Sequence, residues 1–579
     1  MNIPWKKIYW WLEMLVPIII AFPFMFKFVY IDKNRPSAGP CLAVTIITAA
    51  YWIFEPIPIV ITAFIPIFLL PFFTVSTGPK IAASMFTDTS IVFIGGFIFS
   101  IAMVKWNLHS RIALKTVCIF GLRPNILLFG ILVVTTLLSF WISNTACALT
   151  MTPNAIAIIT KLEEITGDPE AIAPFGKALL LMIVMTCSAA GMITLIGTPP
   201  NLILAQTVQN LFPGATEIGF AQFMFVSLPV SMAMLIPLYI FFVIFYTRKV
   251  KIPDSVTADD FKKSYEKLGK WSPAEIIITV MFCILACMWL FRSNIDFGKS
   301  TMKGWSTLIY GSKGSSYIKD GTIAIFLAIL FYIIHVPPPP EKKEGEDEVD
   351  LELRAKTSTT NQHRNNEEED GELDNVNDTP EEDIEQLSIT DSAEPQKEEK
   401  KWVPILDWEY TQQKMPWTIL FLFSGGFALN QGFTDSGLDV WIGERLGGLT
   451  NMSLYPLVLV ITCTTILMTN IVASNTAVAN ILLPIVASVA KSSGKIHPFL
   501  LMFPIAFACS YCFIMPVATP PNLIAYSTGR LKTLDFIIVG TFLTVVAIIV
   551  VPPLCVWIIP PVFNAGEFPA WANASSSTS

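Results

Sequence analysis

A short polar motif occurs twice in an otherwise apolar chain, and both copies have the same surroundings. Ser143-Asn144-Thr145-Ala146 recurs as Ser474-Asn475-Thr476-Ala477, and a proline follows ten residues after each serine, at Pro153 and Pro484. Polar sequences of this kind are tolerated among apolar residues only where protein or water surrounds them. The sequence therefore predicts a binding site that the chain carries twice.

Two further features flank each copy in the same order. A Thr-Pro-Pro-Asn sequence lies downstream, in Gly197-Thr198-Pro199-Pro200-Asn201 and in Ala518-Thr519-Pro520-Pro521-Asn522. A glycine pair lies upstream, in Gly95-Gly96-Phe97 and in Gly425-Gly426-Phe427. Three motifs in the same order in both halves predict an internal structural repeat, as in secondary transporters that bind their substrate between repeats.

The composition places the chain in a lipid bilayer. Of 579 residues, 53% are hydrophobic and 14% are charged, with a mean hydropathy of +0.59, whereas about a quarter of the residues of soluble proteins are charged. We expect an all-α polytopic membrane protein with about eleven spans of roughly 20 residues, some of them tilted or broken. The apolar stretches lie near residues 8–30, 41–54, 58–75, 88–104, 178–206, 220–247, 272–291, 321–336, 416–432, 497–528 and 534–560.

Two more apolar stretches, near 124–160 and 454–490, hold the Ser-Asn-Thr motifs at their centres. We interpret them as re-entrant hairpins whose tips face an interior site. The stretches near 178–206 and 497–528 each contain one Pro-Pro sequence, which removes amide donors and breaks a helix. Five predicted spans separate the hairpins, and this odd number makes the repeat inverted.

The net charge of −7 conceals an uneven distribution. Residues 341–401 contain 22 acidic and 8 basic residues, a net charge of −14, which leaves +7 for the remainder. A segment of this composition does not bury enough apolar surface to fold alone. We therefore expect a first membrane half over 1–340, an acidic disordered cytosolic loop over 341–401, and a second membrane half over 402–579.

Basic clusters predict the orientation, because positively charged loops stay in the cytosol. These clusters lie at Lys6-Lys7, Lys105–Arg123, Arg248–Lys251 and Lys262–Lys270. They indicate a plasma-membrane protein with a cytosolic N-terminus and, from the odd number of spans, an extracellular C-terminus. The sequons at Asn451 and Asn573 then fall outside the cell, where we expect Asn573 to be glycosylated.

The residue types of the motifs suit both an anion and a cation. The tip of a hairpin presents helix N-termini, whose free N–H groups and partial positive charge favour anions. Neutral oxygens of Ser, Asn and Thr, together with carbonyls freed by a Pro-Pro break, ligate a hard cation such as Na⁺. Each half is therefore predicted to build one cation site, and the glycine pairs are expected to serve close helix packing.

Other residues carry weaker signals. We expect Glu55 to be a carboxylate at a helix end, Asp88 to cap the span that begins there, and His109 and His497 to lie at the surface. The ten cysteines lie almost all in apolar stretches and are expected to be packing residues. The sequence contains no nucleophile–base constellation, phosphate-binding loop or metal-ligand cluster, so we expect neither an enzyme nor a nucleic-acid partner.

The paired Ser-Asn-Thr and Thr-Pro-Pro-Asn motifs resemble those of divalent anion:sodium symporters, the sodium/dicarboxylate and citrate transporters of INDY type. Animal members are similar over Lys105-Trp106-Asn107-Leu108-His109, Trp141–Thr145 and Leu406-Asp407-Trp408. Thr476, Pro200 and Gln431 depart from residues common in vertebrate members, and these departures leave the preference between citrate and succinate open.

The resemblance implies a homodimer that works as an elevator, with a scaffold from the early spans of each repeat and a mobile domain that holds both hairpins. It also implies the site residues. The first sodium ion would bind Ser139, Ser143, Asn144 and the backbone at Gly197, and the second Asn470, Ser474, Asn475 and the backbone at Ala518. The substrate carboxylates would contact Asn144, Thr145, Asn475 and Thr476, with Pro200 and Pro521 beside them.

The predicted function is a sodium-coupled symporter, with Na⁺ as coupling ion, for di- or tricarboxylates such as succinate and citrate. Two alternatives stay open. A sodium-independent dicarboxylate or citrate exchanger would keep the same architecture, and a sulfate or other oxyanion carrier of the same family would use the same anion-binding helix ends.

Overall fold

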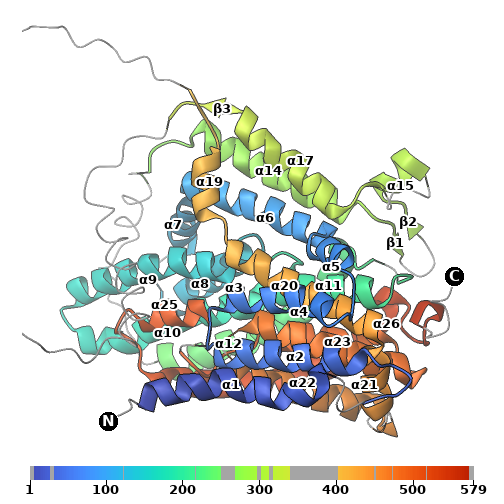
Figure 1. Ribbon diagram of the computed structural model, residues 1–579. Helices are drawn as coiled ribbons and strands as arrows, with labels where there is room; N and C mark the ends of the chain where they lie inside the picture. Colours follow the sequence, from blue (N-terminus) through green and yellow to red (C-terminus); the bar gives the residue numbers. More distant parts are fainter. Residues whose placement is uncertain are drawn as a thin grey trace, which may run out of the picture.

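The computed structural model is a bundle of helices (Figure 1). It describes residues 5–26, 31–120, 123–215, 217–248, 266, 268–296, 301–311, 317–338, 402–446, 448, 451–472, 474–516 and 518–572. The acidic segment predicted over 341–401 and the predicted glycosylation site Asn573 lie outside these residues.

The helices that precede the first Ser-Asn-Thr motif are α1 (Trp5–Met25), α2 (Ala38–Phe54), α3 (Ile59–Thr62), α4 (Phe64–Phe72), α5 (Gly78–Met85), α6 (Asp88–Lys105) and α7 (Leu108–Phe120). Glu55 ends α2 in a left-handed conformation with φ of 51°, so it lies at a helix end as predicted. The capping prediction for Asp88 is wrong by one residue. Thr87 is the N-cap of α6, with its N–H donating to Ser90 Oγ at 3.4 Å. Asp88 lies in the first turn, where a carboxylate suits the helix dipole.

The first motif set lies in α8 (Pro124–Ser139), α9 (Asn144–Thr166), α10 (Pro169–Ala190), η1 (Gly191–Ile193) and α11 (Pro199–Leu211), followed by α12 (Phe220–Phe242) and η2 (Val243–Thr247). The Ser-Asn-Thr motif separates α8 from α9, and the backbone is irregular between η1 and α11. Both prolines of the Pro-Pro pair start α11, where a missing N–H costs no helical hydrogen bond.

The second motif set repeats this order in α22 (Leu454–Ile471), α23 (Asn475–Ser493), α24 (Pro498–Ala508) and α25 (Pro520–Tyr526). It is preceded by α20 (Trp417–Ser436) and α21 (Leu438–Leu446) and followed by α26 (Thr533–Phe563) and η5 (Ala570–Ala572). Again the Ser-Asn-Thr motif separates two helices, and again the Pro-Pro pair starts the second part of a broken helix.

Between the two sets lie α14 (Pro273–Leu290), β1 (Ile295–Asp296), β2 (Thr301–Met302), α15 (Trp305–Tyr310), α17 (Asp320–Ile333), β3 (His335–Val336), β4 (Val403–Pro404) and α19 (Trp408–Lys414). Strands β1 and β2 pair antiparallel, as do β3 and β4. The β3–β4 pair joins the two flanks of the 341–401 segment, and the Lys105–Asp407 ion pair of 2.7 Å ties them to the end of α6. Both flanks therefore lie at one end of α6.

The two motif sets are interlocked. Helix α10 packs on α9 and α24 packs on α23, each within its own set, but the helices after the breaks cross over. Helix α11 of the first set packs on α23 of the second, and α25 of the second packs on α9 of the first. Figure 1 shows α9, α10 and α25 together at one end of the bundle and α11, α20 and α23 together nearer the other. Each set thus completes the surroundings of the other.

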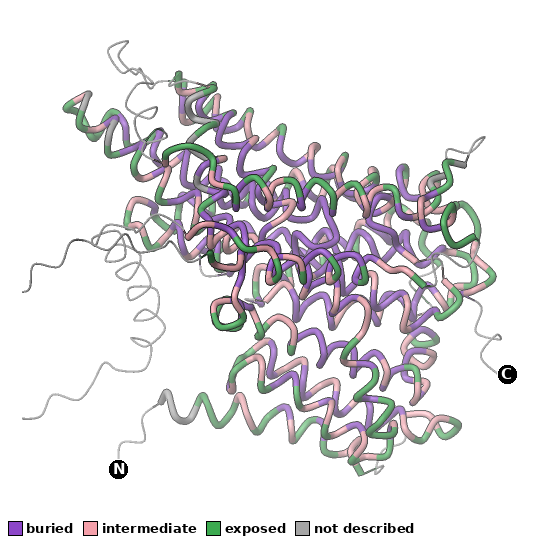
Figure 2. Tube along the Cα trace, turned by 90° about the horizontal axis from the view of Figure 1, so that it is seen from above, coloured by how far each residue is buried: buried purple, intermediate pink, exposed green. Residues whose placement is uncertain are grey.

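Burial is greatest in the interior of the bundle and least at its edges (Figure 2). Helix α10 is buried almost throughout, whereas α1 and α26 expose large apolar side chains such as Ile19 and Trp557. Within the described residues, seven helices are long and apolar enough to cross a membrane, and six shorter apolar helices accompany them. An apolar surface of this extent suits a bilayer, so the chain is a multi-pass membrane protein.

The upstream glycines lie at helix contacts. A Cβ on Gly95 of α6 would lie 3.0 Å from the Ala324 carbonyl carbon of α17, and a Cβ on Gly425 of α20 would lie 2.5 Å from the Ala63 carbonyl oxygen. Both distances are shorter than ordinary contacts, so a side chain at either position would separate the helices. These contacts support the packing role expected from the sequence.

A buried ion-pair network fixes the loop between α14 and α17. The Arg292 side chain is 1% exposed, and its Nε donates to Asp320 at 2.6 Å while Nη2 lies 3.2 Å from Glu217. Burial alone would lower the pKa of Arg292, but the attraction of Asp320 and Glu217 outweighs it and raises that pKa. The guanidinium therefore stays charged, and its partners are needed to stabilise it.

Replacing Asp320 by alanine should lower the free energy of unfolding by about 3–5 kcal/mol, because it leaves the buried Arg292 charge without its main partner. The Glu444→Ala variant is the control. Glu444 is 56% exposed in its pair with Arg35, so its loss should cost at most about 1 kcal/mol. Unfolding midpoints of the purified variants measure both, and equal midpoints for the two variants would contradict the assignment.

Candidate functional site

The two serines of the Ser-Asn-Thr motifs are helix caps. Ser143 Oγ accepts a hydrogen bond from the Ala146 N–H at 3.3 Å, and Ser474 Oγ accepts one from the Ala477 N–H at 3.2 Å. The motif asparagine and threonine therefore occupy the first turns of α9 and α23, whose leading N–H groups have no intrahelical acceptor. Two helix N-termini of this kind favour negatively charged ligands.

The two Thr-Pro-Pro-Asn sequences hold the unwound backbone in the same way. Asn201 Nδ2 donates to the carbonyls of Gly191 at 3.4 Å and Thr194 at 2.7 Å, ten and seven residues earlier. Asn522 Nδ2 donates to Cys512 at 3.0 Å and Met515 at 3.2 Å, again ten and seven residues earlier. The repeat seen in the sequence is therefore also a repeat of hydrogen bonds.

Oxygen atoms from three elements converge in the first set. A Cβ built on Gly197 would overlap with the Gly191 carbonyl oxygen and would lie 2.9 Å from the Ser139 carbonyl oxygen, and one on Gly191 would overlap with Asn144 Oδ1. The end of α8, the start of α9 and the break after η1 thus bring uncharged oxygens to one place. Uncharged oxygens at close range are suited to an alkali cation.

Two side chains of this cluster have polar atoms without a partner. Ser139 Oγ and Asn144 Oδ1 are buried and form no hydrogen bond within the described part of the chain. Because nearly all buried polar atoms in proteins are satisfied, such orphaned oxygens need a water molecule or an ion as a partner. The residues predicted for the first sodium ion, namely Ser139, Ser143, Asn144 and Gly197, are therefore brought together by the fold, and their chemistry fits Na⁺.

The second set has the same plan with different side chains. Asn475 Oδ1 is buried and, among the described residues, has no hydrogen-bond partner, as for Asn144. Asn470 takes the position of Ser139, but its side chain is engaged, since Nδ2 donates to Tyr511 O at 3.2 Å and Oδ1 accepts from Ile514 N at 3.2 Å. Ala518 takes the position of Gly197 and adds a methyl group. Asn470 thus holds the unwound segment as well as lying at the predicted cation site.

The residues predicted to contact substrate carboxylates lie on the same helix starts. Thr145 is half-buried in the first turn of α9, and Thr476 is buried in the first turn of α23. Pro200 and Pro521 are buried in the first turns of α11 and α25. Because α11 packs on α23 and α25 on α9, each proline pair belongs to a helix that contacts the motif helix of the other repeat.

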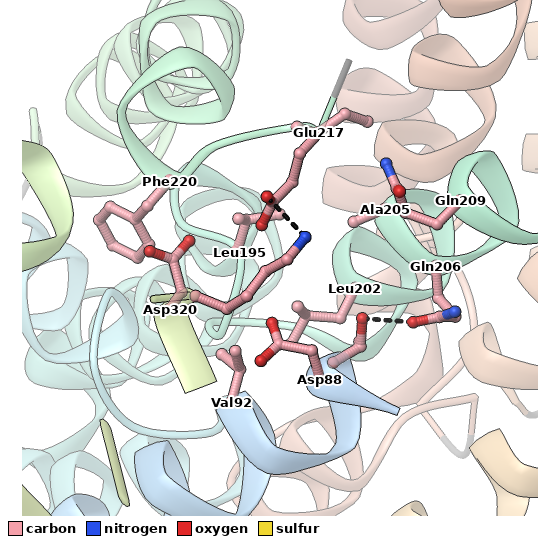
Figure 3. A pocket seen from close by; sticks show the side chains of 13 residues that line it. Asp88, Val92, Leu195, Leu202, Ala205, Gln206, Gln209, Glu217, Phe220 and Asp320 are labelled. Atoms are coloured by element: carbon pink, nitrogen blue, oxygen red, sulfur yellow. Dashed lines mark hydrogen bonds and ion pairs between the residues drawn. The ribbon is translucent and has the colours of Figure 1, made fainter. Parts of the chain in front are cut away.

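A pocket with both charged and apolar walls lies between the start of α6, α11, the segment before α12 and the start of α17 (Figure 3). Its walls include Asp88, Glu217 and Asp320, and Lys319 Nζ lies 2.9 Å from Glu217. Thr89 Oγ1 donates to Gln206 at 2.7 Å across this pocket and links α6 to α11. None of the Ser-Asn-Thr residues lines this pocket, but Leu195 of the unwound segment does, so the pocket adjoins the motif site.

Two histidines do not lie at the surface as the sequence predicts, and the roles of two asparagines were not predicted. His497 is buried, caps α24 and packs against Trp571 with ring centroids 5.3 Å apart, and His109 is buried with Nδ1 3.2 Å from Met103 O, so the surface prediction for both is wrong. Asn201 and Asn522 end the two Thr-Pro-Pro-Asn sequences, and no contact of either side chain was predicted. Their identical place in both repeats was the signal that could have identified them.

Replacing Gly197 by alanine should abolish the stabilisation of the purified protein by Na⁺, because the new methyl group would displace the Gly191 and Ser139 carbonyl oxygens. At sodium ten times its dissociation constant, binding raises the free energy of unfolding by about 1.4 kcal/mol. The Gly96→Ala variant is the control, since its Cβ would lie 3.6 Å from Ile196 in an ordinary contact. Unfolding midpoints of the purified variants, measured in NaCl and in choline chloride, test this prediction. If Na⁺ still raised the midpoint of Gly197→Ala, the proposed cation site would be contradicted.

Comparison with known proteins agrees with this arrangement. The family model described as the sodium:sulfate symporter transmembrane region matches residues 9–563. The chain is 32% identical to the sodium-dependent dicarboxylate transporter SdcS of Staphylococcus saprophyticus over 90% of this chain and 86% of that protein. It is 30% identical to the Na⁺/citrate cotransporter of Rattus norvegicus over 97% of this chain and 95% of that protein.

A solved structure has a similar fold at low identity. The structure of Neisseria gonorrhoeae MtrF, whose title describes a class of antimetabolite efflux pumps, matches with a TM-score of 0.50 and 13% identity. The match covers 85% of this chain and 84% of MtrF, and it concerns the fold alone. The family model and the two transporter relatives decide the classification: the chain belongs to the sodium:sulfate symporter family, that of the divalent anion:sodium symporters that its motifs resemble.

Proposed function

We propose that this protein is a sodium-coupled symporter that moves di- or tricarboxylates such as succinate and citrate across the plasma membrane. The observation that carries the proposal is the cluster of uncharged oxygens around Gly197, with Asn144 Oδ1 and Ser139 Oγ buried and unpaired within the described residues. The names of the relatives, a sodium-dependent dicarboxylate transporter and a Na⁺/citrate cotransporter, support the same cation and substrate class.

The motif site attracts a polyvalent anion only when cations are bound. Its side chains are Ser, Asn and Thr, which carry no formal charge, and the helix N-termini supply only partial positive charge. A carboxylate that leaves water for such a site needs further positive charge nearby to offset the loss of hydration. Sodium ions bound first would supply this charge, and the order of binding would couple the two fluxes.

The site residues keep the roles expected from their positions. The first sodium ion binds Ser139, Ser143, Asn144 and the backbone at Gly197, and the second binds Asn470, Ser474, Asn475 and the backbone at Ala518. The carboxylates bind the first turns of α9 and α23 at Asn144, Thr145, Asn475 and Thr476, beside Pro200 and Pro521. The cross-packing of α11 on α23 and of α25 on α9 supports one shared central site.

The orientation predicted from the basic clusters is compatible with the two ends of the bundle. The start of α1 and the flanks of the acidic segment at Lys105 lie toward one end, whereas η5 lies toward the other (Figure 1). We assign the first end to the cytosol, with α8–α9 and α22–α23 as re-entrant hairpins that enter from opposite sides. A homodimer in which the hairpins and broken helices move together as an elevator domain fits this arrangement.

A sulfate or oxyanion carrier is the second candidate, because the description of the matching family model names sodium and sulfate. Helix N-termini bind sulfate as readily as carboxylates. Competition between substrates separates the two candidates, since the carrier should accept whichever anion fits between the two helix starts.

Uptake of labelled succinate or citrate into cells that express the protein should rise steeply and sigmoidally with external Na⁺ and fall to background in choline medium. Sulfate in excess should not compete. Asn144→Ala and Asn475→Ala should each reduce uptake to background at normal surface abundance, because each asparagine contacts an ion and the substrate. Equal uptake in sodium and choline would indicate an exchanger, and competition by sulfate would indicate the oxyanion carrier.

The orientation predicts that Asn573 carries an N-linked glycan. Deglycosylation should increase the gel mobility of the wild type and leave Asn573→Gln unchanged, and an N-terminal tag should be reached by antibody only after the cells are permeabilised. Asn451→Gln serves as the comparison for the other sequon, at an exposed position before α22. A tag accessible on intact cells would reverse the proposed orientation.

A further inference from the structure

We propose that Asn201 and Asn522 are positioning residues, one in each repeat, that set the sodium affinity of the carrier by fixing the unwound backbone at the cation sites. This inference rests on the sodium-coupled function proposed above. It concerns two residues that lie at the ends of the Pro-Pro motifs and have no role among the expected ligands.

Both asparagines are completely buried, and both make the same contacts. Each amide nitrogen bridges two carbonyl oxygens that precede it by ten and seven residues, Gly191 and Thr194 in the first repeat and Cys512 and Met515 in the second. No regular helix continues past these carbonyls, because the chain is unwound and prolines start the next helix. Thr194 O and Met515 O each accept one turn N–H, from Gly197 and Ala518 at 3.3 Å. One side chain therefore ties the two ends of each unwound segment together.

The orientation of each amide is determined by its surroundings. A flipped amide would place Oδ1 against two carbonyl oxygens, so only Nδ2 is compatible with the observed contacts. The Oδ1 atoms of Asn201 and Asn522 are buried, and neither has a hydrogen-bond partner among the residues that the structure describes. Asn430 and Asn480 also leave a buried Oδ1 unpaired among these residues, so Asn201 and Asn522 are distinguished by the pair of backbone carbonyls that each holds at a candidate ion site.

One of the two carbonyls that Asn201 holds, that of Gly191, belongs to the candidate cation site itself. The Gly191 oxygen lies against the Gly197 Cα, together with the Ser139 carbonyl, and Gly191 Cα lies against Asn144 Oδ1. A carbonyl oxygen has two lone pairs, so a hydrogen bond from Asn201 orients the group and leaves the second pair for an ion. Loss of the donor would free the segment from Gly191 to Gly197 to move away from Asn144.

The two repeats differ in how firmly the segment is held from the other side. In the first, Thr194 Oγ1 donates to Phe140 O at 2.7 Å in the turn before α9, and Ser227 Oγ of α12 donates to Ile193 O at 2.6 Å, but neither bond reaches the Gly191 carbonyl. In the second, Asn470 contacts both Tyr511 O and Ile514 N. Asn470 should hold the second segment in part when Asn522 is replaced, so we expect the larger effect at Asn201.

The test replaces each asparagine by serine and measures uptake of labelled succinate or citrate, whichever the wild type transports, as a function of Na⁺. The sodium concentration for half-maximal uptake should rise about tenfold in Asn201→Ser and less in Asn522→Ser, a change in line with the loss of one or two hydrogen bonds. The substrate KM at saturating sodium should change less than about twofold, because an affinity effect on the ion is overcome by excess ion.

Asn154→Ser is the matched control, since Asn154 Nδ2 also donates to a carbonyl, Thr150 O at 3.0 Å, but within the regular helix α9. It should keep the sodium response of the wild type. The Na⁺-induced shift in unfolding midpoint of the purified variants provides a second measurement that does not depend on transport. It should be reduced in Asn201→Ser and kept in Asn154→Ser.

The outcomes separate this inference from the proposed function. A wild type that transports equally in choline overturns the proposed function. A sodium-dependent wild type with unchanged half-saturation in both serine variants overturns the positioning role alone. Variants that lose maximal rate without a change in sodium dependence, or that fail to fold, would show that the asparagines only stabilise the structure.

Discussion

The structure depends on how the chain satisfies polar backbone where α10 and α24 are interrupted. Each unsatisfied carbonyl or N–H group in a buried position costs about 1–3 kcal/mol, and no lipid group can pair with it. The chain meets this demand with side chains rather than with regular secondary structure. Asn201 and Asn522, each in the first turn of the helix after the gap, donate to carbonyls that precede them by ten and seven residues. Thr194 and Asn470 join the gap to the neighbouring turn.

The same demand explains the interlocked repeats. A helix that begins at a Pro-Pro pair starts abruptly at the centre of the protein, and its first turn must pack against protein rather than lipid. Helix α11 packs against α23, and α25 packs against α9. Each motif set therefore needs the other to bury the helix that starts at its Pro-Pro pair. Two helix starts and two breaks are thereby gathered in one region, and a substrate between them would contact both halves of the chain.

Much of this arrangement could be predicted from the sequence, because it follows from local rules. The capping serines, the helix starts at Asn144 and Asn475, and the breaks before Pro199 and Pro520 all follow from side-chain and proline chemistry that acts over a few residues. The residues that these side chains contact in the folded chain could not be predicted. That Asn470 contacts Tyr511 and Ile514, and that His497 packs against Trp571, depends on contacts between segments that no local pattern specifies. Arg292 likewise gave no sequence signal, although its buried pair with Asp320 fixes the loop before α17.

The two proposed cation sites have the same arrangement of helix start and break, but they leave different amounts of space for an ion. At the first, Gly197 lets the Gly191 and Ser139 carbonyls approach closely, and Ser139 Oγ is unpaired within the described chain. At the second, the corresponding positions hold Ala518 and Asn470, and the amide oxygen of Asn470 already accepts a hydrogen bond from the unwound segment. An ion at the first site would gain a ligand that nothing else uses, whereas an ion at the second would share its ligand with the backbone. The repeat therefore keeps the geometry of the breaks, while the residues proposed as ligands differ between the two sites.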